Sequence, residues 1–372
     1  DYFYQSSKPA ISRRSREMKI GSRYLNFPVS SRTPMGAFRV EIDGKTVYDA
    51  DLRLTDGTPE YWVHKDCSEW LGKTISIVIP FNQNLDAKQH IACGNALSTI
   101  YQSDEPAEKE SFYSESLRPQ VHFTSARGWL NDPCGLVYAG GEWHLSYQHN
   151  MFGTDWGNMS WGHAVSSDLV HWRECSDVLL PDESGSMFSG YSVIDANNVL
   201  GLGSGSIPTV VAFYTAAGEY NYISRDKPFT TCMAYSTDGG MTYVKHGGNP
   251  VLPEVEFQNR DPHVVWSPED NCWVMVLFLG GNTYGFFESS DLKHFTERSR
   301  MDIPGSWECP DFYRVMVAET GEWLYVFTGV HNSYYVGRFS NGRFTPLGGL
   351  RKQDAGSSLL AAHTFAGARI TG

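Results

Sequence analysis

RDPHVVWSPEDNCWVMVLF, residues 260–278, opens with an acidic Pro-containing turn and continues into a Trp-led apolar strand. SSDLKHF follows at residues 289–295, and the same order of segments recurs elsewhere in the chain. The other copies read NDP (131–133), GEWHLSY (141–147) and SSDLVHW (166–172); ECPDFY (308–313) and GEWLYVF (321–327); and, more loosely, FSGYSV (188–193), TVVAFYT (209–215) and STDGGMTY (236–243).

The spacing inside these copies is nearly constant. From the acidic turn to the tryptophan, the pairs Asp132–Trp143, Asp261–Trp273 and Asp311–Trp323 span 11, 12 and 12 residues. All-β repeats of this kind predict a β-propeller in which each copy forms one blade. The alternative is a β-sandwich whose self-similarity is accidental.

The N-terminal third has a different pattern, because residues 25–100 alternate with a period of two. Phe38, Val40 and Ile42 share one face of GAFRVEI, and Asp43-Gly44 predicts a tight turn after it. We expect an all-β chain with a small β-sandwich and acidic linker over residues 1–110 and a propeller domain over residues 117–372.

Composition excludes several function classes. The net charge of −12 argues against a nucleic-acid partner, and the longest apolar runs are too short to span a membrane. The seven cysteines are isolated, which favours buried free thiols over a zinc site or a disulfide framework. The chain begins at Asp1, which is typical of a mature form without a visible signal sequence. No pattern indicates an oligomeric state.

Equivalent positions of propeller blades face the same axis, so the acidic turns are expected to converge. Asp132, Asp261 and Glu308 then become neighbours, and crowding and burial raise the pKa of some of these carboxyls. Calcium binding is an alternative use of clustered carboxylates. However, the Asp-x-Asp spacing of calcium ligands is missing, and the aromatic residues near the turns favour a platform for a sugar. The aromatic residues are Trp129, Trp156, Trp161, Phe188 and Trp307, and some of them are expected to pack in the core.

Cleavage of an acetal at a sugar requires two carboxyl groups, one that attacks or activates water and one that protonates the leaving oxygen. From the residues alone, Asp132 or Asp261 qualifies as the nucleophile. Glu308 is the natural acid because its side chain has the longer reach. The third carboxylate is expected to hold substrate hydroxyls.

Together these segments resemble glycoside hydrolase family 32, which contains invertases, inulinases, levanases and other β-fructofuranosidases. WLNDPCG (129–135) is similar to the family's WMNDPNG signature, and RDP (260–262) and WECPDF (307–312) resemble its other two catalytic blocks. FSG (188–190) and WGNMSWGHAVSSDLVHW (156–172) also resemble family segments, so the likeness covers residues 117–370.

The resemblance implies a five-bladed propeller and a retaining mechanism on a fructan or sucrose, with no metal or organic cofactor. It implies that Asp132 is the nucleophile, Glu308 the general acid and then base, and Asp261 the transition-state stabiliser. It also implies a set of residues that line the fructosyl subsite, namely Asn131, Gln148, Trp156, Phe188, Ser189 and Arg260.

Two letters depart from the family pattern: Cys134 replaces the second Asn of the signature, and His149 stands where Tyr is usual. LLAAHTF (359–365) and GARITG (367–372) resemble the start of a fifth blade, which is therefore expected to be incomplete. The usual C-terminal β-sandwich is absent from the sequence, so a fragment or a shortened enzyme is expected.

KIGSRYLNFPV (19–29) and the stretch after it resemble a module that precedes such catalytic domains in gut Bacteroidetes. This likeness implies a bacterial, exported protein, either periplasmic, at the cell surface or secreted. The alternatives to a fructan or sucrose hydrolase are a fructan-binding protein without turnover, fructosyl transfer, and an inverting hydrolase of arabinan or xylan. The sequence pattern does not distinguish β-2,6 from β-2,1 linkages or endo from exo attack.

Overall fold

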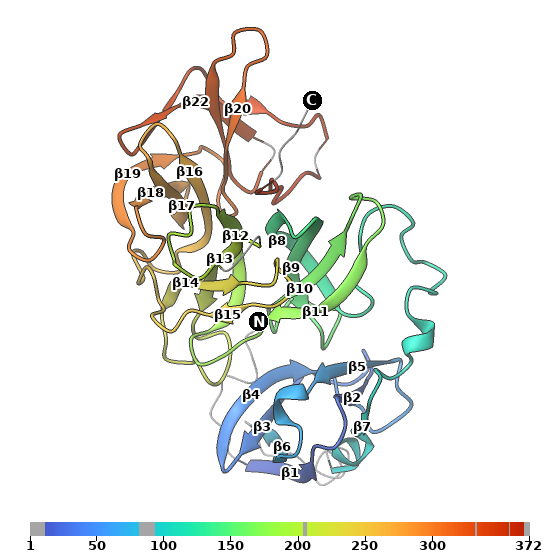
Figure 1. Cartoon of the computed structure of the whole chain (residues 1–372). Coiled ribbons are helices and arrows are strands. Elements are labelled where there is room, and N and C mark those ends of the chain that lie inside the picture. Colours follow the sequence, from blue (N-terminus) through green and yellow to red (C-terminus); the bar gives the residue numbers. More distant parts are fainter. Residues whose placement is uncertain (1–11, 82–93, 204–206, 332, 357, 368–372) are drawn as a thin grey trace.

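The computed structural model describes residues 12–81, 94–203, 207–331, 333–356 and 358–367, and its regular elements are almost all β-strands (Figure 1). The helical elements in these ranges are the short 3-10 helices η2 (Ser68–Trp70) and η3 (Lys109–Ser111) and the helical residues 94–99. The predicted all-β class is therefore confirmed. No helix among the described residues is long and apolar enough to cross a membrane.

Two antiparallel sheets form the N-terminal part. The first has the order β1-β6-β3-β4 and the second the order β5-β2-β7. Their strands are β1 (Ser12–Lys19), β2 (Tyr24–Val29), β3 (Gly36–Ile42), β4 (Lys45–Leu52), β5 (Tyr61–Asp66), β6 (Thr74–Phe81) and β7 (Tyr101–Ser103). The sheets support the proposal of separate domains at residues 1–110 and 117–372.

The alternating pattern explains the core of this N-terminal sandwich. Phe38 and Val40 of β3 and Ile77 of β6 are buried in one cluster. The turn between β3 and β4 uses Asp43 and Gly44, whose φ angles of 51° and 76° suit the left-handed conformation of a tight hairpin.

Four blades follow in chain order, three with four strands and the fourth with a fifth strand added. Blade 1 is β8 (Trp129–Ala139), β9 (Glu142–Asn150), β10 (Ser160–Ser166) and β11 (Arg173–Leu179). Blade 2 is β12 (Ser186–Asp195), β13 (Thr209–Ala217), β14 (Phe229–Ser236) and β15 (Val244–Lys245). Blade 3 is β16 (Arg260–Ser267), β17 (Cys272–Gly280), β18 (Thr283–Ser289) and β19 (Thr296–Asp302). Blade 4 is β20 (Asp311–Met316), β21 (Trp323–Thr328), β22 (Ser333–Ser340) and β23 (Arg343–Pro346), with β24 (Arg351–Lys352) paired to β22.

The first strands of the blades are innermost, because β8, β12, β16 and β20 contact one another in sequence. The recurring Ser-x-Asp segments form the same turn after the third strand of blades 1 and 3, and a turn one residue longer in blade 2. In blade 1, the Ser166 hydroxyl accepts a bond from Leu169 N at 2.8 Å, and Asp168 Oδ1 accepts bonds from the next two backbone N–H groups. Local turn chemistry therefore accounts for this part of the repeat.

Apolar side chains between neighbouring blades form the propeller core. Val211, Phe213 and Met233 of blade 2 pack with Trp273 and Met275 of blade 3 in one buried cluster, and similar clusters join the other pairs. Neighbouring blades thus share their cores, as expected when a single blade cannot bury both of its faces.

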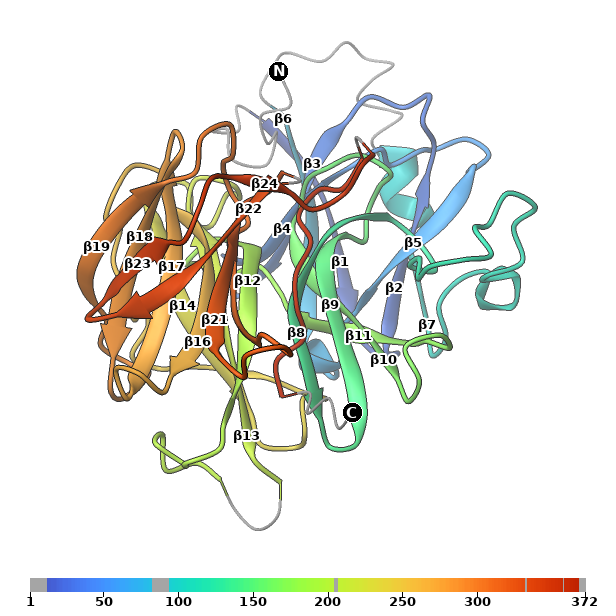
Figure 2. The ribbon, with the colours of Figure 1, turned by 90° about the horizontal axis from the view of Figure 1, so that it is seen from above.

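The chain returns from blade 4 to blade 1 through residues 360–366 (Figure 2). Leu360 bridges to His331 of blade 4, and Ala366 pairs in parallel with Val137 of β8. This segment lies where the innermost strand of a fifth blade is expected. The rest of GARITG, residues 368–372, lies outside the described residues.

The loop between β9 and β10 inserts into the N-terminal sandwich. Phe152 of this loop is fully buried in the sandwich core, with its ring centroid 5.3 Å from that of Phe38. Asn158 closes the loop through two bonds to the backbone of Asp51, at 2.7 and 2.8 Å. Trp156 lies between these two anchors, so the sandwich holds the loop that carries a predicted site residue.

Candidate active site

Three acidic turns from different blades meet at the thiol of Cys309. Cys309 Sγ lies 3.3 Å from Asp132 Oδ2 of blade 1 and 3.7 Å from Asp261 Oδ2 of blade 3. Glu308 immediately precedes this cysteine at the entry to blade 4. Arg260 and Glu308, 48 positions apart, and Asp132 and Cys309, 177 positions apart, therefore meet in space. The structure therefore brings the three predicted carboxyl residues together.

Asp132 is held in an irregular part of β8. The pairing of β8 with β9 shifts between Leu130 and Pro133, which frees the Asn-Asp-Pro turn from a regular ladder. Ser189 of β12 donates its hydroxyl to Asp132 Oδ2 at 2.8 Å. Two side chains therefore fix the same carboxylate oxygen.

Asp261 is the buried member of the group, with 4% of its surface exposed. Its backbone N donates to the Thr215 hydroxyl at 2.9 Å, and its Oδ2 accepts a bond from Cys309 N at 3.0 Å. Burial raises the pKa of Asp261 to about 7, and the nearby charge of Glu308 adds to this effect. Asp261 is therefore close to half-protonated near neutral pH.

Glu308 forms an ion pair with Arg260. The guanidinium Nε and Nη2 lie 2.8 and 2.7 Å from Glu308 Oε1, and the Tyr284 hydroxyl donates to the Glu308 carbonyl at 3.0 Å. Asp261, Glu308 and Cys309 all have positive φ angles, at 61°, 50° and 42°. Non-glycine residues in this region of conformational space carry backbone strain, which concentrates at functional sites.

Aromatic side chains adjoin residues that carry or contact the carboxyls, since Phe188 precedes Ser189 and Trp307 precedes Glu308. Phe188 contacts Trp156 and Tyr220 edge-on, with ring centroids 5.7 and 4.9 Å away. Trp307, beside Glu308, meets His331 at 4.3 Å and remains 43% exposed. Trp156 is 39% exposed, so two of the predicted platform tryptophans retain surface for a ligand.

Three other residues named by the sequence analysis already have hydrogen-bond partners within the protein. Trp161 is 1% exposed and donates its Nε1 hydrogen to the Phe188 carbonyl at 3.0 Å, so it is a core residue and not a platform. Gln148 is buried and donates to the Met187 carbonyl at 2.9 Å. Asn131 accepts a bond from Trp129 Nε1 at 2.8 Å, which orients both side chains.

The two departures from the family pattern have structural explanations. Cys134 is fully buried between blades 1 and 2, in the cluster that contains Trp161. His149 is also buried and pairs with Asp177, with Nδ1 and Oδ1 3.0 Å apart. Burial alone lowers the pKa of His149, but the charge of Asp177 and their hydrogen bond outweigh it and raise this pKa to about 9.

Several residues that the sequence analysis missed also surround the carboxyls. Cys309 separates two of them, and Thr215 supports Asp261. Burial raises the pKa of Tyr220, and the charge of nearby Arg260 opposes this increase. His363, in the segment that follows blade 4, lies close to Asp132; burial lowers its pKa to about 4, against the effect of the Asp132 charge. None of these positions recurs in the repeat, so the repeat gives no signal for them. LLAAHTF, which contains His363, is expected from the sequence only to begin a fifth blade.

Among the described residues, no group of three or more His, Cys, Asp or Glu side chains is arranged to hold a metal ion. The six described cysteines are all free thiols, and Cys93 lies outside the described residues.

Comparison with known proteins gives consistent matches. Residues 122–371 match the sequence profile of the glycosyl hydrolases family 32 N-terminal domain. A levanase of Bacillus subtilis is 42% identical over 217 residues, which cover 57% of this chain and 31% of the levanase. An invertase of Schizosaccharomyces pombe is 37% identical over 279 residues, which cover 68% of this chain and 47% of the invertase.

Solved structures show the same relationship. An exo-inulinase from Aspergillus awamori matches with a TM-score of 0.62 and 31% identity, over 69% of this chain and 58% of the inulinase. A fructofuranosidase from Schwanniomyces occidentalis, complexed with fructose, matches with a TM-score of 0.62 and 33% identity, over 69% of this chain and 53% of that protein. These relatives have a five-bladed β-propeller, which confirms the predicted fold class. The matched part of the chain spans 31% of the levanase and 47% of the invertase, so about a third to a half of these curated relatives.

Proposed function

Because this chain belongs to glycosyl hydrolase family 32, we propose that it hydrolyses β-fructofuranosidic bonds in a fructan or in sucrose. The observation that carries the proposal is the convergence of Asp132, Asp261 and Glu308 from three blades around one buried thiol. Two carboxyls meet the minimum for glycoside cleavage, and the third is available to hold substrate hydroxyls.

In the proposed mechanism, Asp132 attacks the anomeric carbon of the fructosyl unit while Glu308 protonates the departing glycosidic oxygen. A fructosyl ester forms on Asp132, and the remainder of the substrate leaves as an alcohol. Glu308, now ionised, removes a proton from water, and that water attacks the same carbon and releases fructose and Asp132. Two inversions give overall retention.

The contacts of Asp132 and Glu308 leave one oxygen of each carboxyl for these roles, and the acid step requires that Glu308 first take up a proton against its ion pair with Arg260. Ser189 and Cys309 engage Asp132 Oδ2, so Oδ1 is the oxygen assigned to attack. Arg260 engages Glu308 Oε1, so Oε2 is the oxygen assigned to carry the transferred proton. Each reacting carboxyl thus has one oxygen fixed by the protein, which orients the other.

Asp261 and the aromatic side chains are assigned to substrate binding. A carboxyl that is half-protonated near neutral pH both donates to and accepts from sugar hydroxyls, which matches the raised pKa of Asp261. Trp156, Phe188 and Ser189 are assigned to the fructosyl subsite with Asn131, Gln148 and Arg260. Extracellular relatives such as the exo-inulinase of Aspergillus awamori support export of this protein, and a bacterial source remains part of the proposal.

The test is incubation of the chain with levan, inulin and sucrose, followed by identification of the products. We expect fructose or fructo-oligosaccharides from at least one substrate, and a loss of about 10³-fold or more in Asp132→Asn. Asp195→Asn is the matched control, because Asp195 is a buried aspartate at the far end of β12, the strand that carries Ser189. Binding without products indicates a fructan-binding protein, and full activity in Asp132→Asn refutes the nucleophile assignment.

A further inference from the structure

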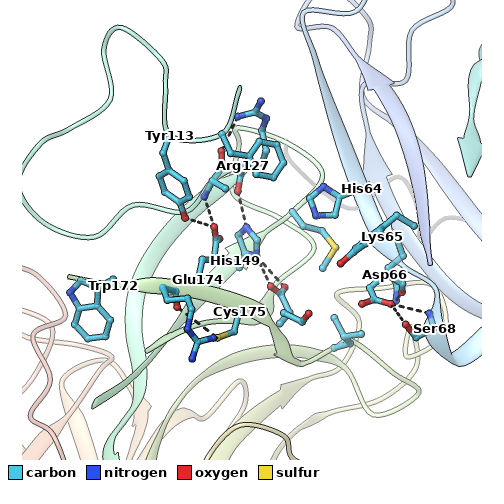
Figure 3. A pocket seen from close by; sticks show the side chains of 18 of the residues that line it. His64, Lys65, Asp66, Ser68, Tyr113, Arg127, His149, Trp172, Glu174 and Cys175 are labelled. Carbon is cyan, nitrogen blue, oxygen red and sulfur yellow. Dashed lines mark hydrogen bonds and ion pairs between the residues drawn. The ribbon is translucent and has the colours of Figure 1, made fainter. Parts of the chain in front are cut away.

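A cavity of about 840 Å³ lies between the N-terminal sandwich and blade 1, apart from the three carboxyls. His64, Lys65 and Asp66 of β5 line one side, and His149 of β9 and Glu174 and Cys175 of β11 line the other (Figure 3). Its volume falls within the range of about 300–1,000 Å³ that is usual for small-molecule sites. The cavity exists only because the two parts of the chain pack together.

Aromatic side chains line much of this interdomain cavity. On the sandwich side, the His64 ring stacks on Phe112 at 6.1 Å and meets Tyr24 edge-on at 5.4 Å. Tyr113 and Trp172 line it from the propeller side, and Tyr113 is 47% exposed. Rings at the wall of a cavity offer flat apolar faces to the C–H faces of a sugar.

The cationic groups of the cavity wall are already paired within the protein, and its carboxylates accept hydrogen bonds or ion pairs. His149 pairs with Asp177 at 3.0 Å, and Arg127 pairs with Glu115 at 2.6 Å. Glu174 accepts hydrogen bonds from the Tyr113 and Tyr147 hydroxyls and from the backbone at residue 126. An anionic ligand would therefore find no unpaired cation among these groups, whereas a neutral ligand leaves the ion pairs and the hydrogen bonds of Glu174 intact.

His64 brings a polar ring to the wall. Figure 3 shows its side chain beside the cavity, and no hydrogen bond joins it to the other cavity residues drawn there. Burial lowers the pKa of His64 to about 4, so the imidazole is neutral at physiological pH. A neutral imidazole presents one donor and one acceptor, which matches a sugar hydroxyl.

We propose that this interdomain cavity is an accessory site for a neutral carbohydrate, namely a second segment of the fructan chain. The carbohydrate class follows from the rings, the paired cations of the wall and His64, while the choice of fructan rests on the proposed function. The site holds a polymer near the active site without taking part in bond cleavage. Its effect is therefore confined to substrates long enough to reach both sites.

The kinetic test uses Trp172→Ala in the full chain, with Trp172→Phe as the conservative variant. We expect Trp172→Ala to raise KM for levan or inulin polymer by about three- to tenfold and to leave kcat and the KM for sucrose within twofold. Trp172→Phe should restore the polymer KM. Trp323→Ala is the matched control, because Trp323 is a 47% exposed tryptophan on β21 that stacks over Arg314, away from the cavity. Equal polymer KM in Trp172→Ala and the unaltered chain overturns the proposal.

A second measurement does not depend on turnover. Cys175 lines the cavity, and Cys272 at the start of β17 is another partly buried free thiol that serves as an internal control. In the Asp132→Asn protein, a levan-type or inulin-type oligosaccharide at ten times its Kd should slow alkylation of Cys175 about tenfold, while Cys272 is unaffected. Site-resolved mass spectrometry measures both rates.

The outcomes separate the two proposals. If the unaltered chain yields no product but Cys175 is protected, the proposed hydrolase function fails and the accessory site stands. If the chain hydrolyses fructan but Cys175 is not protected, the accessory site is refuted alone. Equal protection by a malto-oligosaccharide refutes the assignment to fructan.

Discussion

Phe152 is the side chain through which the N-terminal sandwich holds the loop that carries Trp156. The ring has no exposed surface, and its centroid lies 5.3 Å from Phe38 and 5.8 Å from Phe27. Truncation of a buried phenylalanine to alanine costs about 3–5 kcal/mol, so Phe152→Ala should lower Tm by about 5–10 °C. Asn158 still anchors the far end of the loop, so Trp156 becomes loosely held rather than lost.

The functional consequence is expected in KM. Because Trp156 belongs to the proposed fructosyl subsite, a loosened loop should raise KM for sucrose by about five- to tenfold, which corresponds to about 1 kcal/mol. Initial rates at 25 °C and thermal melts followed by circular dichroism measure the two effects separately.

Ile77→Ala provides the matched control, because Ile77 is also fully buried in the sandwich core but belongs to β6. It should lower Tm by a similar amount and leave KM unchanged. If Ile77→Ala raises KM as much as Phe152→Ala, or if Phe152→Ala leaves KM unchanged, Phe152 does not position the subsite.

Three further substitutions probe the carboxyl site and its support. Asp261→Asn should remove turnover. It should also stabilise the fold by up to about 4 kcal/mol at pH 8, because the pKa of Asp261 is raised from 3.8 to about 7 and the stability that this carboxyl contributes when protonated is lost as pH rises through 7. Asp177→Asn should lower the free energy of unfolding by about 3 kcal/mol at pH 6.5 and below, because Asp177 raises the pKa of His149 from 6.5 to about 9 and the protonated histidine contributes its full stability there. Urea titrations should show this loss vanish above pH 9. Gly190→Ala should cut kcat, because a Cβ there would lie 2.0 Å from a carbonyl of β13 and displace the neighbouring Ser189.

Two of these variants have a control in the chain. Asp168 pairs with His171 at 2.7 Å on the surface, so Asp168→Asn should change stability far less than Asp177→Asn. A Cβ at Gly21 would meet nothing within 4 Å, so Gly21→Ala should leave kcat intact. An unchanged Tm at pH 8 in Asp261→Asn would contradict the burial argument for that carboxyl.

The repeat was enough to predict the arrangement of the blades. Equivalent turns face one axis whatever the surrounding sequence, so the meeting of Asp132 and Asp261 with the ECPD segment followed from the spacing, and Glu308 is the carboxyl of that segment whose longer side chain suits an acid. The resemblance then gave each carboxyl its proposed role. Side chains between the repeated turns were harder to predict, because strand periodicity does not say which residues of an irregular loop are buried.

Trp156 and Trp161 illustrate this limit. They are five residues apart in one segment, yet the first is 39% exposed and the second is 1% exposed. Trp161 fills the space that Gly135 leaves, where a Cβ would come within 2.5 Å of its ring. Such a fit depends on the packing of two strands and leaves no periodic signal. Tyr220 and the interdomain cavity were missed for the same reason, since both depend on contacts between distant segments.

The Cys309 thiol lies among the site carboxyls, and this position has a consequence for the redox chemistry of the protein. Burial raises the pKa of Cys309 well above its usual value, and the charges of Asp261 and Asp132 raise it further. Only the thiolate reacts readily with oxidants and electrophiles, so Cys309 stays inert wherever the protein is folded. Cys134 is protected in the same way by burial and by Asp132. The carboxyl site can therefore tolerate an oxidising environment although it is built around a free sulfur.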